Sequence, residues 1–179
     1  MTDRIPASIV ARWPWALWSI AVFNLVCAAG LGAQPASPTP ADKVVVHKKT
    51  HTLELMRNGS AFRKYKVALG TAPVGAKTQQ GDHKTPEGTY VIDRRNAHSQ
   101  FYRALHISYP NAEDRERAQE SRIPAGGDIM IHGLPNGLGR VGSAHRLRDW
   151  TDGCIAVTDE EMDEIWDLVP NGTTIEILP

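Results

Sequence analysis

Short hydrophobic runs rich in strand-forming residues recur along the chain after residue 43, one of them with alternating hydrophobic and polar positions, and this pattern predicts β-strands. In the run 52–56, Leu53 and Leu55 flank Glu54, which is typical of a strand with one buried face. Asn58-Gly59 supplies the residues of a tight turn after this run. Further strand-like runs lie at 44–46, 65–69, 89–92, 101–110, 128–133 and 173–178.

Two segments carry a different pattern and predict helices. Residues 111–121 (NAEDRERAQES) are polar and rich in helix formers, which predicts a short surface helix. Thr158 and Glu161 form a capping box at the start of a second helix, which Pro170 and Gly172 end. One apolar face of this helix is expected from Met162, Ile165, Trp166 and Val169. The sum is a mainly β fold, a sandwich or barrel-like sheet with one or two short helices.

The first 33 residues have a separate organisation. Arg4 and Arg12 precede an apolar stretch over 13–33 that ends in small residues. This pattern is typical of a secretory signal peptide cleaved near Ala33. The alternative is an uncleaved anchor that contacts the membrane, because the stretch approaches the roughly 20 residues that span a bilayer. Both interpretations export the rest of the chain to the periplasm or cell envelope: a Pro/Ser-rich linker, 34–42, and one domain, 43–179.

Charge and cysteine content narrow the function. The chain has 20 Lys and Arg against 20 Asp and Glu, so its composition gives no attraction to nucleic acid. Its two cysteines are Cys27, inside the apolar stretch, and Cys154, in the polar segment DWTDGCIAV. If the leader is removed, Cys154 has no partner in its own chain. An odd thiol in an exported protein indicates a reactive group or intermolecular pairing.

Cys154 has the neighbours that a nucleophile needs. A thiol attacks as the thiolate, which an imidazole makes available, and His132 stands at the end of a predicted strand. Gly133 allows substrate to approach closely, and the backbone N–H groups of Gly153 and Cys154 are candidate oxyanion donors. On spacing alone, a lone Cys and a lone His more often have structural roles.

Two separated motifs make the chain resemble a known family from Lys43 to its C-terminus. These are GDHKTPEGTY (81–90), and IHG (131–133) followed by TDGCI (151–155), which are similar to motifs of the L,D-transpeptidase, or YkuD, catalytic domain. The segments HISYPN and GGDIMIHG are similar to the branch with periplasmic enzymes that detach lipoprotein from the cell wall. The resemblance implies a β-sandwich or barrel-like fold, a Cys154 nucleophile and a His132 base.

The resemblance also implies a substrate, the stem peptide of peptidoglycan. Attack on the carbonyl of the third-position diamino acid would form a thioester, release D-alanine and pass the acyl group to an amine, without cofactor or metal. With water as acceptor the same site would be a carboxypeptidase, endopeptidase or amidase that releases wall-linked peptide or lipoprotein. Ala156, where many relatives carry a basic or amide side chain, favours this second interpretation. A non-catalytic wall-binding module is the third; we favour transpeptidation, the wider family's activity.

The loop before Cys154 adds candidate substrate-binding residues, each with an alternative. Arg140 and Arg148, with Arg146 between them, either pair with stem-peptide carboxylates or are solvated. His145 either contacts substrate or, as we favour, is a solvated loop histidine. Zinc binding by this histidine together with Cys154 and His132 is disfavoured, because the spacing matches no known metal motif.

The residues beside the cysteine are also ambiguous. Asp149 or Asp152 either holds the ammonium group of a diamino acid or shapes a turn. Thr151 is a catalytic-loop hydroxyl or a turn residue. Trp150 is a platform for the peptide or glycan, or a packed lid residue.

Overall fold

The computed structural model describes residues 39–179, and the structural statements below concern that part of the chain. The expected leader over 1–33, and the expected linker as far as residue 38, lie outside the described residues. Ala41, at the end of the expected linker, is buried in the core and its N–H donates to the Leu168 carbonyl. No helix within 39–179 is long and apolar enough to cross a membrane.

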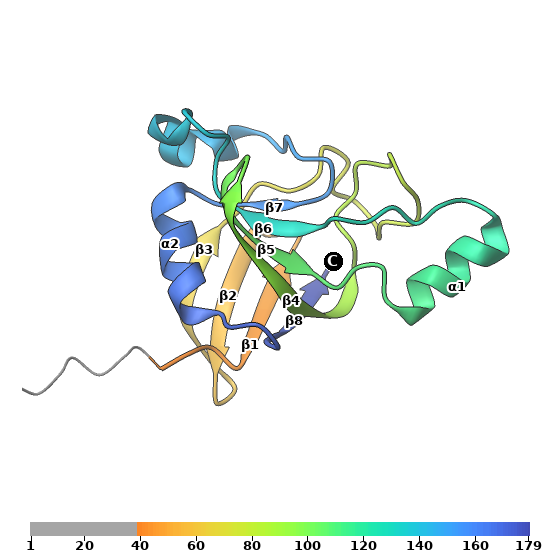
Figure 1. Ribbon diagram of the computed structural model, residues 1–179, viewed down its shortest axis with the longest axis horizontal. Coiled ribbons are helices and arrows are strands. Elements are labelled where there is room, and N and C mark those ends of the chain that lie inside the picture. Colours follow the sequence, from red (N-terminus) through yellow and green to blue (C-terminus); the bar gives the residue numbers. More distant parts are fainter. Residues whose placement is uncertain (1–38) are drawn as a thin grey trace, which may run out of the picture. The chain divides into compact units, whose positions relative to one another are not determined.

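The described residues form one sheet of eight strands with three short helices (Figure 1). The strands are β1 (Lys43–His47), β2 (Thr52–Arg57), β3 (Ser60–Lys66), β4 (Gly88–Ser99), β5 (Tyr102–Ile107), β6 (Met130–His132), β7 (Ile155–Ala156) and β8 (Thr174–Leu178). The helices are α1 (Ala112–Ser121), α2 (Asp159–Leu168) and the 3₁₀ helix η1 (Gly139–Leu147). Two α-helices and a dominant sheet confirm the predicted mainly β fold class.

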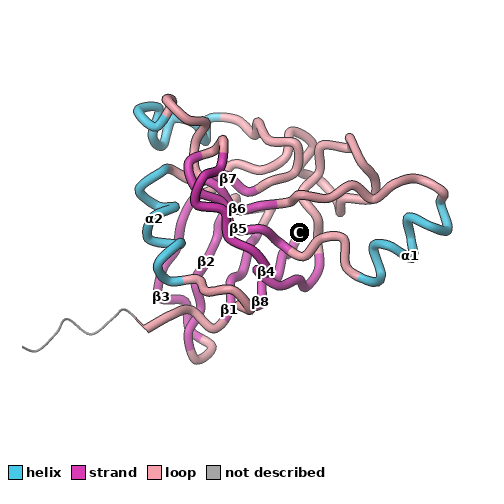
Figure 2. Tube along the Cα trace, viewed as in Figure 1, coloured by secondary structure: helices cyan, strands magenta, loops and turns pink. Residues whose placement is uncertain are grey.

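The sheet has the strand order β3-β2-β1-β8-β4-β5-β6-β7 and mixes parallel with antiparallel pairs. Strand β1 pairs antiparallel with β2 and parallel with β8, and β6 pairs parallel with β7. The two edges of this sheet approach each other, because Ala68 bridges Ala156 and Gly70 bridges Thr151 just beyond β3. The sheet therefore curls toward closure, as the curved trace in Figure 2 shows.

Alternation along the strands builds the core, as the sequence predicts. Leu53 and Leu55 of β2 are fully buried, while Glu54 between them is partly exposed. Helix α2 packs against β5, and its apolar residues Met162 and Ile165 are fully buried. Its capping box is confirmed, since the Thr158 hydroxyl accepts from the Glu161 N–H. Helix α1 lacks an apolar face and projects from the sheet at the right of Figure 1.

Four segments differ from the prediction. Strand β4 extends seven residues beyond the expected 89–92, because its polar end pairs with β5 although it has few buried positions. The strand expected over 65–69 instead runs over Ser60–Lys66 as β3, and residues 67–69 leave it, with Ala68 forming a bridge to Ala156 at the opposite edge of the sheet. The loop expected between residues 134 and 150 contains η1, and the two-residue strand β7 carries no separate signal.

Candidate active site

Parallel pairing of β6 with β7 brings Cys154 close to His132. In the register, Ile131 lies opposite Ile155 and His132 lies opposite Ala156, so Cys154 lies beside Met130. Side chains alternate between the faces of a sheet. Ile131 and Ile155 point into the core, and the side chains of His132 and Cys154 therefore share the other face.

That face opens into a cavity of about 550 Å³ that contains both side chains. His132 is only 3% exposed, whereas Cys154 is partly exposed at the cavity wall. The lining residues are Asn96, His98, Ser99, Gln100, Phe101, Asp128, Met130, His132, Trp150, Thr151, Asp152 and Cys154. Sequence reasoning missed the wall from 96 to 101, at the tip of the β4–β5 hairpin, because those polar residues form no chemical motif.

The His132 ring has a defined tautomer and a strongly perturbed basicity. Its Nδ1 lies 2.7 Å from the Gly133 carbonyl oxygen, to which it donates, so Nε2 is the nitrogen left to accept a proton. The rings of Phe101 and Trp150 lie 4.6 and 5.7 Å from the imidazole, centroid to centroid. Burial lowers the pKa of His132 to about 4, against a raising effect of its bond to Gly133. The imidazole is therefore neutral at pH 7.

The thiol of Cys154 is also shifted toward its neutral form. Burial is the largest cause that raises its pKa, and the negative charges of Asp152 and Asp128 raise it further. Its Sγ lies 3.6 Å from the Asp128 carbonyl oxygen, within reach of a weak S–H donor. Thiol and imidazole are thus both uncharged in the free protein near neutral pH.

The turn that carries Cys154 is held by the buried hydroxyl of Thr151. This hydroxyl donates to the Cys154 carbonyl at 2.7 Å and accepts from the Gly153 N–H at 3.2 Å. No acceptor for the Cys154 N–H is found within residues 39–179. Gly153 has φ +125°, and a Cβ there would lie 2.5 Å from the Lys84 carbonyl oxygen. Thr151 thus shapes the turn, and only glycine fits at 153.

The segment 81–90 packs against this turn and explains why its motif accompanies the cysteine. Gly70 lies between the two, since a Cβ on it would meet the His83 carbonyl oxygen at 2.2 Å and the Gly153 Cα at 3.1 Å. The Thr85 hydroxyl accepts from the Gly70 N–H at 3.2 Å. The buried ammonium of Lys48 donates to the Thr85 carbonyl and to Glu87. The motif is therefore a scaffold for the turn.

Two residues of the loop before Cys154, His145 and Trp150, are more buried than a solvated loop would allow. His145, expected to be solvated, is only 9% exposed, and its Nδ1 accepts from the Trp150 indole N–H at 3.3 Å. Burial lowers the pKa of His145. Trp150 is half-buried and packs edge-on against His132, while it also lines the cavity. Its two suggested roles, platform and packed residue, are compatible.

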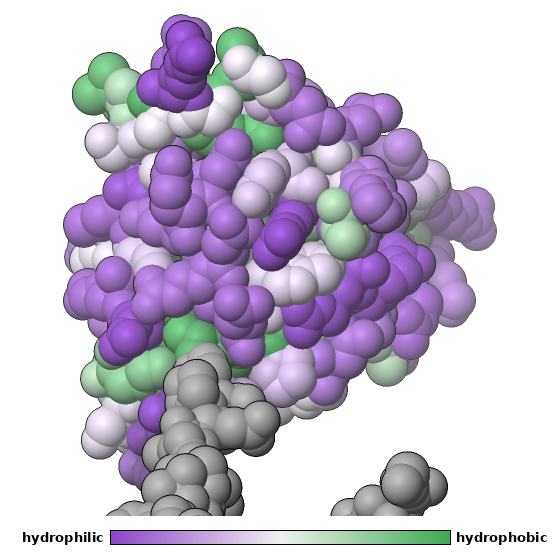
Figure 3. Space-filling model, turned by 60° about the vertical axis from the view of Figure 1, so that its left-hand side comes forward, coloured by the Kyte–Doolittle hydropathy of each residue, from purple (hydrophilic) through white to green (hydrophobic). Residues whose placement is uncertain are grey.

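The three arginines of the loop do not line the Cys154 cavity. Arg140 is exposed, Arg146 pairs with Glu161, and Arg148 lines a neighbouring groove of about 600 Å³. This groove is mostly apolar, shares Trp150 with the cavity, and includes Leu147, which is 88% exposed. Figure 3 shows apolar surface near the top of the molecule, at the level of η1 in Figure 1.

The two aspartates beside Cys154 point to different places. Asp149 is turned inward, where its Oδ1 accepts from the Leu69 N–H at 2.7 Å and its Oδ2 lies 2.9 Å from His51 Nε2. Asp152 lines the cavity and is 89% exposed.

Across residues 39–179, no group of three or more His, Cys, Asp or Glu side chains is arranged to hold a metal ion.

Comparison with known proteins places this geometry in a family. Residues 41–177 match the family model described as YkuD, L,D-transpeptidase catalytic domain. The Escherichia coli protein named "Putative L,D-transpeptidase YafK" is 30% identical over 159 residues, which cover 79% of this chain and 57% of that protein. This chain therefore spans just over half the length of the curated relatives it matches.

Solved structures agree with this assignment. The helical cell shape determining protein Pgp2 of Campylobacter jejuni, as a K307A mutant, is 26% identical with a TM-score of 0.59, over 79% of this chain and 48% of that one. Bdellovibrio bacteriovorus Bd1075 shares the fold at 22% identity and a TM-score of 0.54, over 78% and 48%. On the family match, which covers most of the sequence, this chain belongs to the YkuD family of L,D-transpeptidase catalytic domains.

Proposed function

We propose that the protein is a cysteine-dependent acyl transferase acting on peptidoglycan stem peptides in the cell envelope. Cys154 attacks the carbonyl of the third-position diamino acid, and His132 is the general base. The observation that carries this proposal is the placement of both side chains on one face of adjacent strands, in a single cavity. The family match supports the substrate, and the leader-like sequence over 1–33 supports export.

The protonation states favour base catalysis over a preformed ion pair. Because the pKa of His132 is lowered and that of Cys154 is raised, the resting pair is thiol and neutral imidazole. The proton moves from Sγ to His132 Nε2 as the carbon–sulfur bond forms. The tetrahedral intermediate then breaks its carbon–nitrogen bond, and D-alanine leaves with that proton. An acceptor amine attacks the thioester in turn, gives its proton to His132 and restores the thiol.

The developing oxyanion needs donors, and the turn offers one directly. The Cys154 N–H has no other acceptor within 39–179 and can bind the oxyanion without losing a bond. The Gly153 N–H donates to Thr151 Oγ1, so its participation requires an exchange of that bond. Gly133 does not line the cavity: it is buried, and a Cβ on it would lie 2.6 Å from the Asp159 carboxylate and 2.9 Å from Tyr102, so its lack of a side chain serves packing. Trp150 lines the cavity and offers a ring to the peptide or glycan. Arg148, in the neighbouring groove, is a candidate partner for a stem-peptide carboxylate.

The test is incubation of the protein with defined tetrapeptide muropeptides, with and without an acceptor amine, followed by mass spectrometry. Crosslinked products support transpeptidation. Free tripeptides, or protein released from protein-linked stems, would assign the same site to hydrolysis with water as acceptor. Cys154→Ala should abolish either activity without changing the circular dichroism spectrum. If the wild-type protein binds muropeptides and leaves them intact, the catalytic proposal fails and the wall-binding module is the correct interpretation.

A further inference from the structure

The cavity around Cys154 has a negative lining. Its only formally charged residues are Asp128 and Asp152, and neither Lys nor Arg lines it. Two cations act from outside this lining: the Arg94 guanidinium lies 3.7 Å from the Asp128 carboxylate, and the positive charge of Lys77 lowers the pKa of Cys154. Asp152 is the carboxylate at the open rim, two residues from the nucleophile. A ligand group beside Cys154 is therefore favoured when it carries a positive charge.

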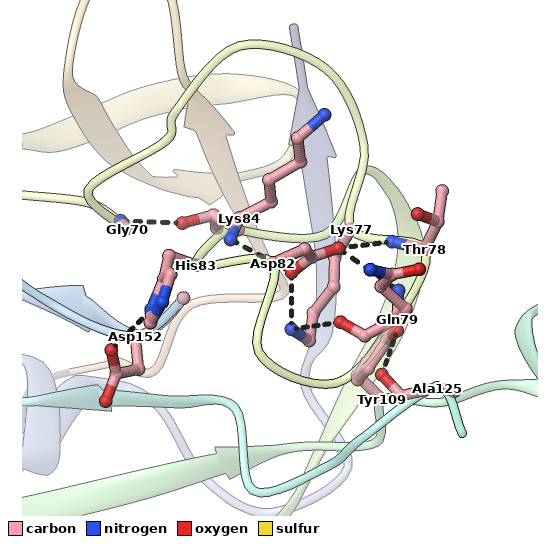
Figure 4. A network of polar contacts seen from close by, with 12 residues as sticks. Gly70, Lys77, Thr78, Gln79, Asp82, His83, Lys84, Tyr109, Ala125 and Asp152 are labelled. Atoms are coloured by element: carbon pink, nitrogen blue, oxygen red, sulfur yellow. Dashed lines mark hydrogen bonds and ion pairs between the residues drawn. The ribbon is translucent and has the colours of Figure 1, made fainter. Parts of the chain in front are cut away.

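Asp152 is held in place on one side only. Its Oδ1 lies 2.7 Å from Nδ1 of His83, and Oδ2 has no partner within the described residues. Figure 4 shows the two side chains facing each other, His83 from the loop before β4 and Asp152 from the catalytic turn. An oriented carboxylate with one free oxygen is suited to receive an ammonium group, which brings three donors and no acceptor.

The loop that carries His83 is itself braced. Asp82 Oδ1 accepts from the buried Lys77 ammonium at 2.7 Å and from the Lys84 N–H at 3.1 Å. Asp82 Oδ2 accepts from the N–H groups of Thr78 and Gln79 (Figure 4). These bonds outweigh burial and lower the pKa of Asp82 to about 2, so the brace persists across the physiological pH range. His83 is therefore presented to Asp152 from a fixed position rather than from a free loop.

The carboxylate also acts on the reacting sulfur. After burial, the negative charge of Asp152 is one of the causes that raise the pKa of Cys154, which places this charge within electrostatic reach of Sγ. A cation bound to Asp152 would offset that effect. Charge recognition and activation of the thiol are thereby linked through one residue.

We propose that Asp152 is a specificity-determining residue that binds the free side-chain ammonium of the substrate's diamino acid, with His83 as its positioning residue. This inference rests on the proposed function for the identity of the ligand. Stem peptides whose third residue carries a free side-chain amine bind productively. Stems in which that amine is acylated lose the contact with Asp152.

Binding to an inactive variant tests this recognition separately from catalysis. The probes are two synthetic stem tetrapeptides with lysine at the third position, one with a free side-chain amine and one Nε-acetylated. Titration of Cys154→Ala in a calorimeter should show about tenfold tighter binding of the free amine, which corresponds to about 1.4 kcal/mol. In the Cys154→Ala background, Asp152→Asn should reduce this ratio to near one, Asp152→Glu should retain part of it, and His83→Ala should give an intermediate ratio.

Asp167→Asn, on the exposed face of α2, is the matched control and should leave the ratio unchanged. Equal binding of the two peptides to Cys154→Ala, or an unchanged ratio in Asp152→Asn, overturns the inference. A retained ratio in a wild-type protein that forms no thioester would instead refute the proposed function and leave the recognition by Asp152 intact.

Discussion

Thr151→Val removes two hydrogen bonds from the turn that carries Cys154. The Thr151 side chain is only 5% exposed, and its hydroxyl joins the Cys154 carbonyl to the Gly153 N–H. Valine keeps the branched shape but leaves both backbone groups without this partner. Each lost bond costs about 1 kcal/mol, and an unsatisfied buried group adds to that cost, so we expect a loss of about 2–3 kcal/mol.

Urea denaturation measures this loss as a lower free energy of unfolding. For a domain of this size, the same change should lower the Tm by roughly 5–10 °C. Thr151→Ser keeps the hydroxyl and is the matched control, which should lie within about 1 kcal/mol of the wild type. If Thr151→Val is as stable as Thr151→Ser, the hydroxyl does not hold the turn and the account of this loop is wrong.

Four further predictions follow from individual residues. Because burial lowers the pKa of His132 to about 4 from an ordinary value near 6.5, the unfolded chain binds more protons between these values. The free energy of unfolding should therefore fall by up to about 3 kcal/mol as the pH drops from about 6.5 to 4, and denaturation midpoints should fall with it. His132→Gln should flatten this pH dependence. For the same reason, acyl transfer should not lose its base until the pH approaches 4, which a pH profile of kcat/KM in the wild type checks. Asp152→Asn removes one of the charges that raise the Cys154 pKa, so iodoacetamide should alkylate Cys154 faster at pH 8; an unchanged rate would exclude this charge effect. Lys48→Met leaves Glu87 and two carbonyls near a buried apolar group, and thermal denaturation should show a loss of about 3 kcal/mol or more, whereas an unaltered midpoint would contradict this role.

Much of the fold was predictable because local rules determined it. The alternation at Leu53 and Leu55 identified β2, and the Thr158 capping box identified the start of α2. The long β4 was not predictable, since its polar second half is a strand only through pairing with β5. Residues 67–69 have strand composition, but their bridge partners lie almost 90 residues away in the sequence.

The candidate site likewise has some features that local sequence motifs predict and others that depend on contacts between distant segments. Motifs identified Cys154 and His132 as partners, and the register of β6 with β7 provides the geometry that this pairing needs. Sequence could not choose between Asp149 and Asp152, because the choice depends on the inward contacts of Asp149 with Leu69 and His51. The burial of His145 was missed for a similar reason, since its contact with the Trp150 indole N–H forms only in the folded loop.

Mass spectrometry of the intact protein tests the central claim most directly. After brief mixing with a tetrapeptide stem in the absence of acceptor amine, we expect a mass increase equal to the tripeptide acyl group, mapped to Cys154 and absent from Cys154→Ala. His132→Gln should form the same adduct far more slowly. Turnover of the stem by Cys154→Ala, or an adduct on a different residue, would contradict the assignment of this thiol as the nucleophile.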